Sequence, residues 1–110
     1  MVYFLVCLTG PGLAWVLATC PDDSIRDGDQ ALRIAQQLNR RTKFKNAEFL
    51  DTYAAALAEQ GLFGDALEYG DKAVAAARAS NRDDLASEIS RRVDLYRQRQ
   101  PYRGKTPTSN

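Results

Sequence analysis

Two stretches of the chain read almost alike, Leu13-Ala14-Trp15-Val16-Leu17-Ala18 and Tyr53-Ala54-Ala55-Ala56-Leu57-Ala58. Each is followed by a second segment rich in small residues, 31–35 after the first stretch and 66–70 after the second. The leading alanines of these segments, Ala31 and Ala66, lie 35 positions apart. A unit of about that length, made of two helices, is typical of arrays of stacked helical hairpins. The sequence therefore predicts an all-α fold of stacked antiparallel hairpins.

Apolar periodicity and capping residues predict the ends of the helices. Asp27 and Asn46 are N-cap candidates, and Gly61 stands where a helix C-terminal glycine belongs. Asn81 and Asp84 offer a cap for a last helix that Pro101 ends. The expected helices are 13–19, 28–39, 46–60, 64–79 and one within 80–100. No segment alternates apolar and polar residues in the manner of a strand.

These elements divide the chain into four parts. Residues 1–12 form an apolar N-terminal segment that acts as a cap or a remnant, and 13–79 form the two hairpins. Residues 80–100 contain a C-terminal capping helix. Residues 101–110 have little to bury and are expected to be a mobile tail.

Residues 47–79 resemble a tetratricopeptide repeat. The repeat places a large, a small and a second large apolar residue on its first helix, then a turn glycine, then two alanines seven positions apart on its second helix. The matching residues are Tyr53, Ala54, Leu57, Gly61, Ala66 and Ala73. Alanine at facing positions lets the two helices of a hairpin approach closely.

Residues 13–38 resemble a less regular second copy of the repeat. Its matching residues are Leu13, Ala14, Leu17, Ala31 and Leu38. The connector is longer, because Leu17 and Ala31 are 14 positions apart, against nine between Leu57 and Ala66. The sequence over residues 13–103 is similar to the C-terminal repeats of bacterial multi-repeat proteins of this family.

The resemblance implies a protein-interaction scaffold that binds a peptide or partner in a helical groove. The positions equivalent to groove residues are Trp15, Glu48, Asp51, Thr52, Ala55 and Glu59, with Ala18, Thr19 and Ala58 beside them. Family members that bind chaperone tails carry lysine and asparagine where this chain has Asp51 and Ala55, so that specificity is not expected. An acidic groove favours a basic or neutral peptide. The alternative is that the acids are merely solvated and that Trp15 packs under the N-terminus.

Composition excludes several classes of function. The chain has no histidine, which removes histidine-based catalytic triads. No glycine-rich phosphate loop is present, and adjacent carboxylates such as Asp83-Asp84 suit helix starts better than catalysis. We therefore expect no enzyme, metal or cofactor. The net charge of +1 does not suit nucleic-acid binding. Residues 91–110 carry a local net charge of +5, interpreted as a solvated face with pairs such as Glu88–Arg92.

The first 21 residues carry no charged side chain, which fits a signal peptide, a membrane span or a buried helix. Gly10-Pro11-Gly12 interrupts the apolar run, and no positive residue precedes it. We therefore expect a cytoplasmic protein, with a membrane-anchored or exported one, held by residues 1–20, as the alternative. Cys7 and Cys20 are expected to be free buried thiols, with a Cys7–Cys20 bridge as the lesser possibility.

The first hairpin lacks a preceding repeat to stack on. Leu13, Val16, Leu17 and the segment 2–8 are available at that open end. An uncovered apolar patch marks an interaction site. The partner is upstream repeats, another protein or a second copy of the chain, and the sequence predicts self-association through residues 1–20.

Overall fold

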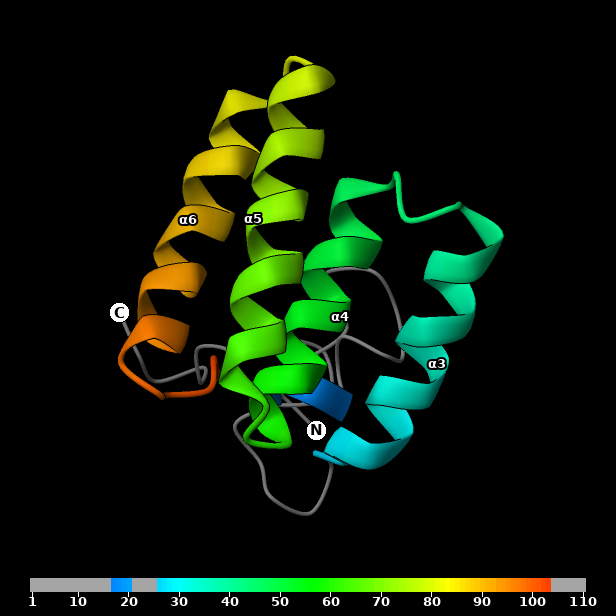
Figure 1. Ribbon diagram of the computed structural model, residues 1–110, viewed down its shortest axis with the longest axis vertical. Helices are drawn as coiled ribbons and strands as arrows, with labels where there is room; N and C mark the ends of the chain where they lie inside the picture. The colour runs from blue at the N-terminus through cyan, green and yellow to red at the C-terminus, as the bar shows by residue number, and fades with distance from the viewer. Residues whose placement is uncertain (1–16, 21–25, 104–110) are drawn as a thin grey trace.

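The computed structural model describes residues 17–20 and 26–103. Its long helices are α3 (Gly28–Arg41), α4 (Ala47–Glu59), α5 (Phe63–Ala79) and α6 (Asp83–Arg97), and residues 17–19 are also helical. Figure 1 shows α3 at one side, α4 and α5 in the middle and α6 at the other side. Each helix packs on the next along the chain. The described residues contain no strand, so the all-α class is confirmed for them.

Local signals set the starts of α3 and α4. The Asp27 carboxylate accepts a hydrogen bond of 3.1 Å from the backbone N–H of Gln30. The Asn46 side chain accepts one of 3.0 Å from the N–H of Phe49. At the other end of α4, Gly61 has a left-handed φ of 80°, and the N–H of Leu62 donates back to the carbonyl of Leu57. These three expectations are confirmed.

The start of α6 differs from the expectation. Its N-cap is Arg82, which makes no side-chain capping bond, and Asp84 lies in the first turn. Asn81 instead closes α5, because its φ of 60° is left-handed and the next N–H, that of Arg82, donates 2.8 Å to the carbonyl of Ala77. Asparagine tolerates this conformation better than other residues with a side chain. The same residue type thus serves a helix end where the sequence indicated a helix start.

The chain also leaves α6 earlier than Pro101. The helix ends at Arg97, Arg99 has a left-handed φ of 58°, and the N–H of Gln100 donates 2.9 Å to the carbonyl of Leu95. This turn reverses the chain. Residues 101–103 therefore lie under the helices and do not run away from them (Figure 1).

Small residues line the contacts between helices, as the repeat pattern predicts. Ala31, Ala54, Ala66 and Ala73 are fully buried, and Leu57 is nearly so. Leu17 packs in a small cluster with Ala18, Ala31, Ala55 and Ala56, which places residues 17–19 against α3 and α4. Tyr53 and Leu38 are only partly buried. Leu13, Ala14 and Trp15 lie outside the described residues, as does the segment 1–12.

Gly70 marks a close approach of three helices. A Cβ atom added to this residue of α5 would lie 2.6 Å from Val93 Cγ2 on α6 and 3.9 Å from the Cβ of Ala54 on α4. The first distance is far below van der Waals contact, and the branched valine side chain has little freedom to move away. Gly70 is therefore required by packing and not by backbone conformation.

Gly70→Ala should destabilise the protein even though alanine favours helix. Overpacking costs about 1–3 kcal/mol, and the gain in helix propensity is at most about 1 kcal/mol. We expect a net loss of about 1–2 kcal/mol in the free energy of unfolding, measured by urea denaturation. Gly64→Ala in the same helix is the control, because a Cβ there meets nothing within 4 Å. Equal stability of the two variants would contradict the close approach.

Candidate functional site

The residues expected to face a groove are largely engaged within the chain. Thr52 and Ala55 are fully buried, Asp51 is 4 % exposed, and the Thr52 hydroxyl donates to the carbonyl of Glu48. Ala58, Ala18 and Thr19 are buried as well. Glu48 and Glu59 keep partial exposure, and Trp15 lies outside the described residues. The structure thus brings the α4 residues together on one helix, but covers most of them.

Arg92 covers Asp51 from α6. Its Nε donates 3.0 Å to Asp51 Oδ1 and its Nη2 donates 2.6 Å to Asp51 Oδ2, a two-pronged ion pair between helices. Both side chains are nearly buried. The sequence suggested that Arg92 pairs with Glu88 on its own helix, and this is wrong. The pair therefore connects α4 to α6, which are not consecutive along the chain.

Burial and charge act against each other in this pair. Burial raises the pKa of the Asp51 carboxyl, and the charge and hydrogen bonds of Arg92 offset part of that rise. Burial by itself lowers the pKa of Arg92, but Asp51 more than compensates and the pKa of the guanidinium ends above its usual value. The Asp51 carboxylate therefore depends on Arg92 to remain charged in the interior, whereas the arginine is charged in either case.

Tyr96 lies in the same electrostatic environment. Burial, followed by the charge of Asp51, raises the pKa of its phenol above the usual value. The ring belongs to the main core, and its hydroxyl, which is almost fully buried, has no hydrogen-bond partner among the described residues. The interior beside Asp51 thus holds one polar atom that no residue in the described part of the chain satisfies.

Tyr102 folds back over Arg92. Its ring centroid lies 5.1 Å from Arg92 Cζ, and the ring packs against the main core cluster. Such stacking of a guanidinium on an aromatic ring is favourable. The sequence predicted a mobile tail from residue 101. The structure instead places residues 101–103 against α6 and α4 with partial burial, and 104–110 lie outside the described residues.

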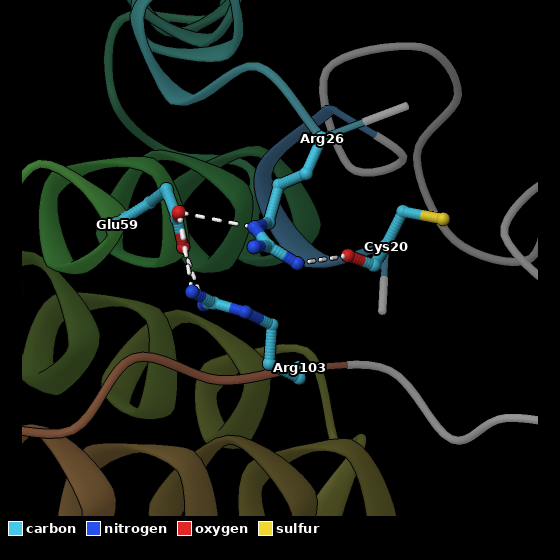
Figure 2. Close-up of polar contacts among 4 residues, drawn as sticks. All are labelled: Cys20, Arg26, Glu59 and Arg103. Carbon is cyan, nitrogen blue, oxygen red and sulfur yellow. Dashed lines mark hydrogen bonds and ion pairs between the residues drawn. The ribbon is translucent and has the colours of Figure 1, made fainter. Parts of the chain in front are cut away.

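Glu59, near the end of α4, receives two arginines. Arg103 donates through Nη1 to Glu59 Oε2 and through Nη2 to Oε1, the latter at 3.3 Å. Arg26 Nε donates 3.1 Å to the same Oε1, and Arg26 Nη1 donates 2.7 Å to the carbonyl of Cys20. Figure 2 shows the carboxylate between the two guanidinium groups. One side chain thus joins the N-terminal part of the chain, α4 and the segment that follows α6.

A glycine makes room for this cluster. A Cβ at Gly28, the first residue of α3, would lie 2.5 Å from Glu59 Cγ. The neighbouring Gln60 Nε2 donates 3.2 Å to Asp29 Oδ1, so the start of α3 and the end of α4 touch through side chains as well. The absence of a side chain at Gly28 therefore lets α3 begin directly against the stem of Glu59.

Glu48 is placed differently from Asp51 and Glu59. Its Oε1 accepts a bond of 3.2 Å from Arg82 Nη1, and both side chains are about half exposed. Such a pair contributes little to stability. Among the acids expected in the groove, Glu48 comes nearest to the merely solvated alternative.

Sequence reasoning missed Arg26, Arg92, Tyr102 and Arg103 as members of the site. The nearest signals were the basic excess of residues 91–110 and the aromatic-arginine pair Tyr102-Arg103. Neither signal indicates which carboxylate an arginine will reach, because the partners are 41 and 44 positions apart.

Within residues 17–20 and 26–103, no three Cys, Asp or Glu side chains are grouped to hold a metal ion. None of the helices in this part of the chain combines the length and the hydropathy needed to cross a bilayer. Cys20 is buried and disulfide-bonded, which overturns the expectation of a free thiol at this position. The chain's other cysteine, Cys7, lies outside the described residues.

The chain significantly matches no protein-family model, no curated protein and no solved structure.

Removing Asp51 should be costly, because it takes a two-pronged carboxylate contact away from the nearly buried guanidinium of Arg92. We expect Asp51→Ala to lower the free energy of unfolding by about 3–5 kcal/mol. The double variant Asp51→Leu with Arg92→Met should recover most of this loss, since it removes both charges at similar volume. Glu48→Ala, which breaks an exposed pair on the same helix, is the control and should cost below about 1 kcal/mol. Chemical denaturation of the parent and the three variants decides, and an Asp51→Ala variant as stable as Glu48→Ala would refute the buried pair.

Proposed function

We propose that the chain is a protein-interaction module of stacked tetratricopeptide-like hairpins, which binds a peptide or protein partner along α4 and α6 and performs no chemistry of its own. The proposal is supported by the order of packing of α3 to α6 and by the buried alanines at the repeat positions. Stacked hairpins present continuous surfaces that suit the binding of other chains.

One observation carries the proposal. The side chains of α4 and α6 already hold a chain segment without regular secondary structure, residues 101–103. Its adjacent residues Tyr102 and Arg103 contact Arg92 and Glu59, so side-chain contacts from both helices hold the segment. We call Arg92 and Glu59 the anchor residues. Two anchors on different helices are the kind of arrangement by which a helical surface recognises a peptide.

Charge limits the partners that this surface suits. Glu59 accepts hydrogen bonds from guanidinium groups, and Glu48 lies on the same helix with partial exposure. A basic or neutral partner fits these acids better than an acidic one. Self-association through the N-terminal residues stays a prediction, since residues 1–16 lie outside the described residues.

The test uses the full chain with its own segment released. Tyr102→Ala with Arg103→Glu removes the ring from Arg92 and reverses the charge opposite Glu59. We expect this released variant to enrich peptides from a random displayed library, and the enriched set to be poor in acidic residues. Arg97→Glu is the matched control, because Arg97 is exposed and pairs with the exposed Asp94 on its own helix, away from both anchor residues. A released variant with parental helix content that enriches no peptides would end the proposal.

A second candidate, the exported form of the same module, is favoured by the state of Cys20. Disulfides persist in oxidising compartments and are rare in the cytosol. Cys20 is disulfide-bonded, and its carbonyl accepts the bond from Arg26 that leads to Glu59. The bridge therefore belongs to the segment that supports the anchor Glu59, and it favours export over the cytoplasmic location expected from composition.

Thiol trapping at cell lysis separates the two locations. Cells are lysed directly into denaturant that contains an alkylating reagent, so that burial does not protect Cys20. If the protein is exported, this reagent should leave Cys20 unmodified, and a second reagent added after reduction should label it. Mass spectrometry of the Cys20 peptide reads the result. The same measurement on purified protein kept in reductant supplies the fully labelled reference. Labelling of Cys20 before reduction would argue for a reducing compartment.

A further inference from the structure

We infer that the ligand of this surface is a peptide with an aromatic residue followed directly by arginine, and that Tyr102 and Arg103 occupy its place in the free protein. The inference rests on the function proposed above and names the ligand chemistry of the same site. The chain therefore carries a copy of its own ligand.

The two anchor residues, Arg92 and Glu59, require different side chains in the ligand. Arg92 presents its guanidinium to a ring centroid 5.1 Å away, and the ring also packs on the main core. An aliphatic side chain supplies the packing but not the attraction between cation and ring. Glu59 receives both Nη atoms of Arg103, one on each carboxylate oxygen. Lysine has one nitrogen on a flexible stem and does not reproduce that two-pronged contact.

Neither anchor is orphaned when the segment leaves. Glu59 keeps its bond of 3.1 Å from Arg26, and Arg92 keeps both bonds to Asp51. The departure of residues 101–103 therefore leaves no buried charge without a partner, which is the costly outcome for a closed ion pair. Arg103 itself is about one third exposed, so its side chain is open to solvent on one side. The contact suits exchange between two occupants better than permanent closure.

The course of the chain after α6 favours binding of its own segment, residues 101–103, over binding of a separate peptide. The left-handed turn at Arg99 reverses the chain just after α6, and residues 101–103 follow without a break. A tethered segment acts at an effective concentration of about 1 mM. For a free peptide with an intrinsic Kd of about 100 μM, occupation in cis weakens apparent binding about tenfold. A partner protein displaces residues 101–103 if it binds the anchor residues more tightly than they do, or if it makes a second contact elsewhere on the surface.

The experiment measures the binding of a labelled synthetic peptide with the sequence of residues 100–110, by fluorescence anisotropy. The proteins are the parent chain, the released variant Tyr102→Ala with Arg103→Glu, and the control Arg97→Glu. We expect the released variant to bind the peptide about tenfold tighter than the parent, and Arg97→Glu to behave like the parent. Should the double variant lose helix content, Arg103→Glu alone, which changes a partly exposed side chain, decides in its place.

Changes in the peptide test the ligand chemistry without touching the protein. Peptides carrying Tyr102→Ala or Arg103→Ala should lose binding to the released variant about tenfold or more, and Arg103→Lys should lose a large part of it. Equal binding of all four peptides would overturn the aromatic-arginine requirement. Equal binding of the unchanged peptide to the parent and to the released variant would overturn occupation by the chain's own segment.

The failures of the two proposals remain distinguishable. A released variant that enriches other library peptides but ignores this one refutes the ligand class and leaves the interaction module standing. A folded released variant that binds neither this peptide nor any from the library refutes the proposed function and the inference with it. Enrichment of library peptides together with binding of the unchanged peptide, lost on its alanine substitutions, supports both.

Discussion

The structure depends on a close approach of three helices at Gly70. Because α5 has no side chain there, Val93 of α6 comes closer to its backbone than any Cβ permits, and Ala54 of α4 lies on the same spot. The small residues on α4 and α5 thus allow α6 to lie close to α4, although α4 and α6 are not consecutive helices. That proximity is what allows Arg92 to span from α6 to Asp51. The packing of small residues comes first, and the charge pair is possible only because of it.

The ion pair between Asp51 and Arg92 in turn changes which groups α4 presents at its surface, because it covers the Asp51 carboxylate with a guanidinium. A buried pair between charged groups is weak evidence for stability, because desolvation consumes most of the attraction. Its clearer effect here is to fix where the guanidinium of Arg92 lies, and Tyr102 stacks on that guanidinium. At the far end of α4, Gly28 and Arg26 place Glu59 in the same manner. Both anchor residues, Arg92 and Glu59, are therefore ordered by internal contacts before any proposed ligand reaches them.

The sequence predicts the parts of this fold that depend on near neighbours. Asp27, Asn46 and Gly61 act on N–H and carbonyl groups within one turn, so residue type and position suffice to place them. Arg92 shows where such reasoning ends. Glu88 lies one turn away and offers an ion pair at helix spacing, yet Asp51, distant in sequence, offers a drier and two-pronged contact once α4 and α6 are packed. The expectation that Asn81 caps the start of α6 was wrong for a related reason, because asparagine is favoured at both ends of a helix.

The position of residues 101–103 could not be predicted from composition. These residues have little apolar surface of their own to bury, yet they become partly buried because they pack on the helices. Tyr102 and Arg103 follow a turn whose left-handed residue is Arg99, a type with no special preference for that conformation. The turn exists because backbone hydrogen bonds close the end of α6, and the ring and guanidinium then gain Arg92 and Glu59. A modestly unfavourable backbone conformation is thus offset by two side-chain contacts. On the proposed function, a peptide that carries the same two side chains competes for both contacts, and the balance between the turn and these contacts decides which chain is bound.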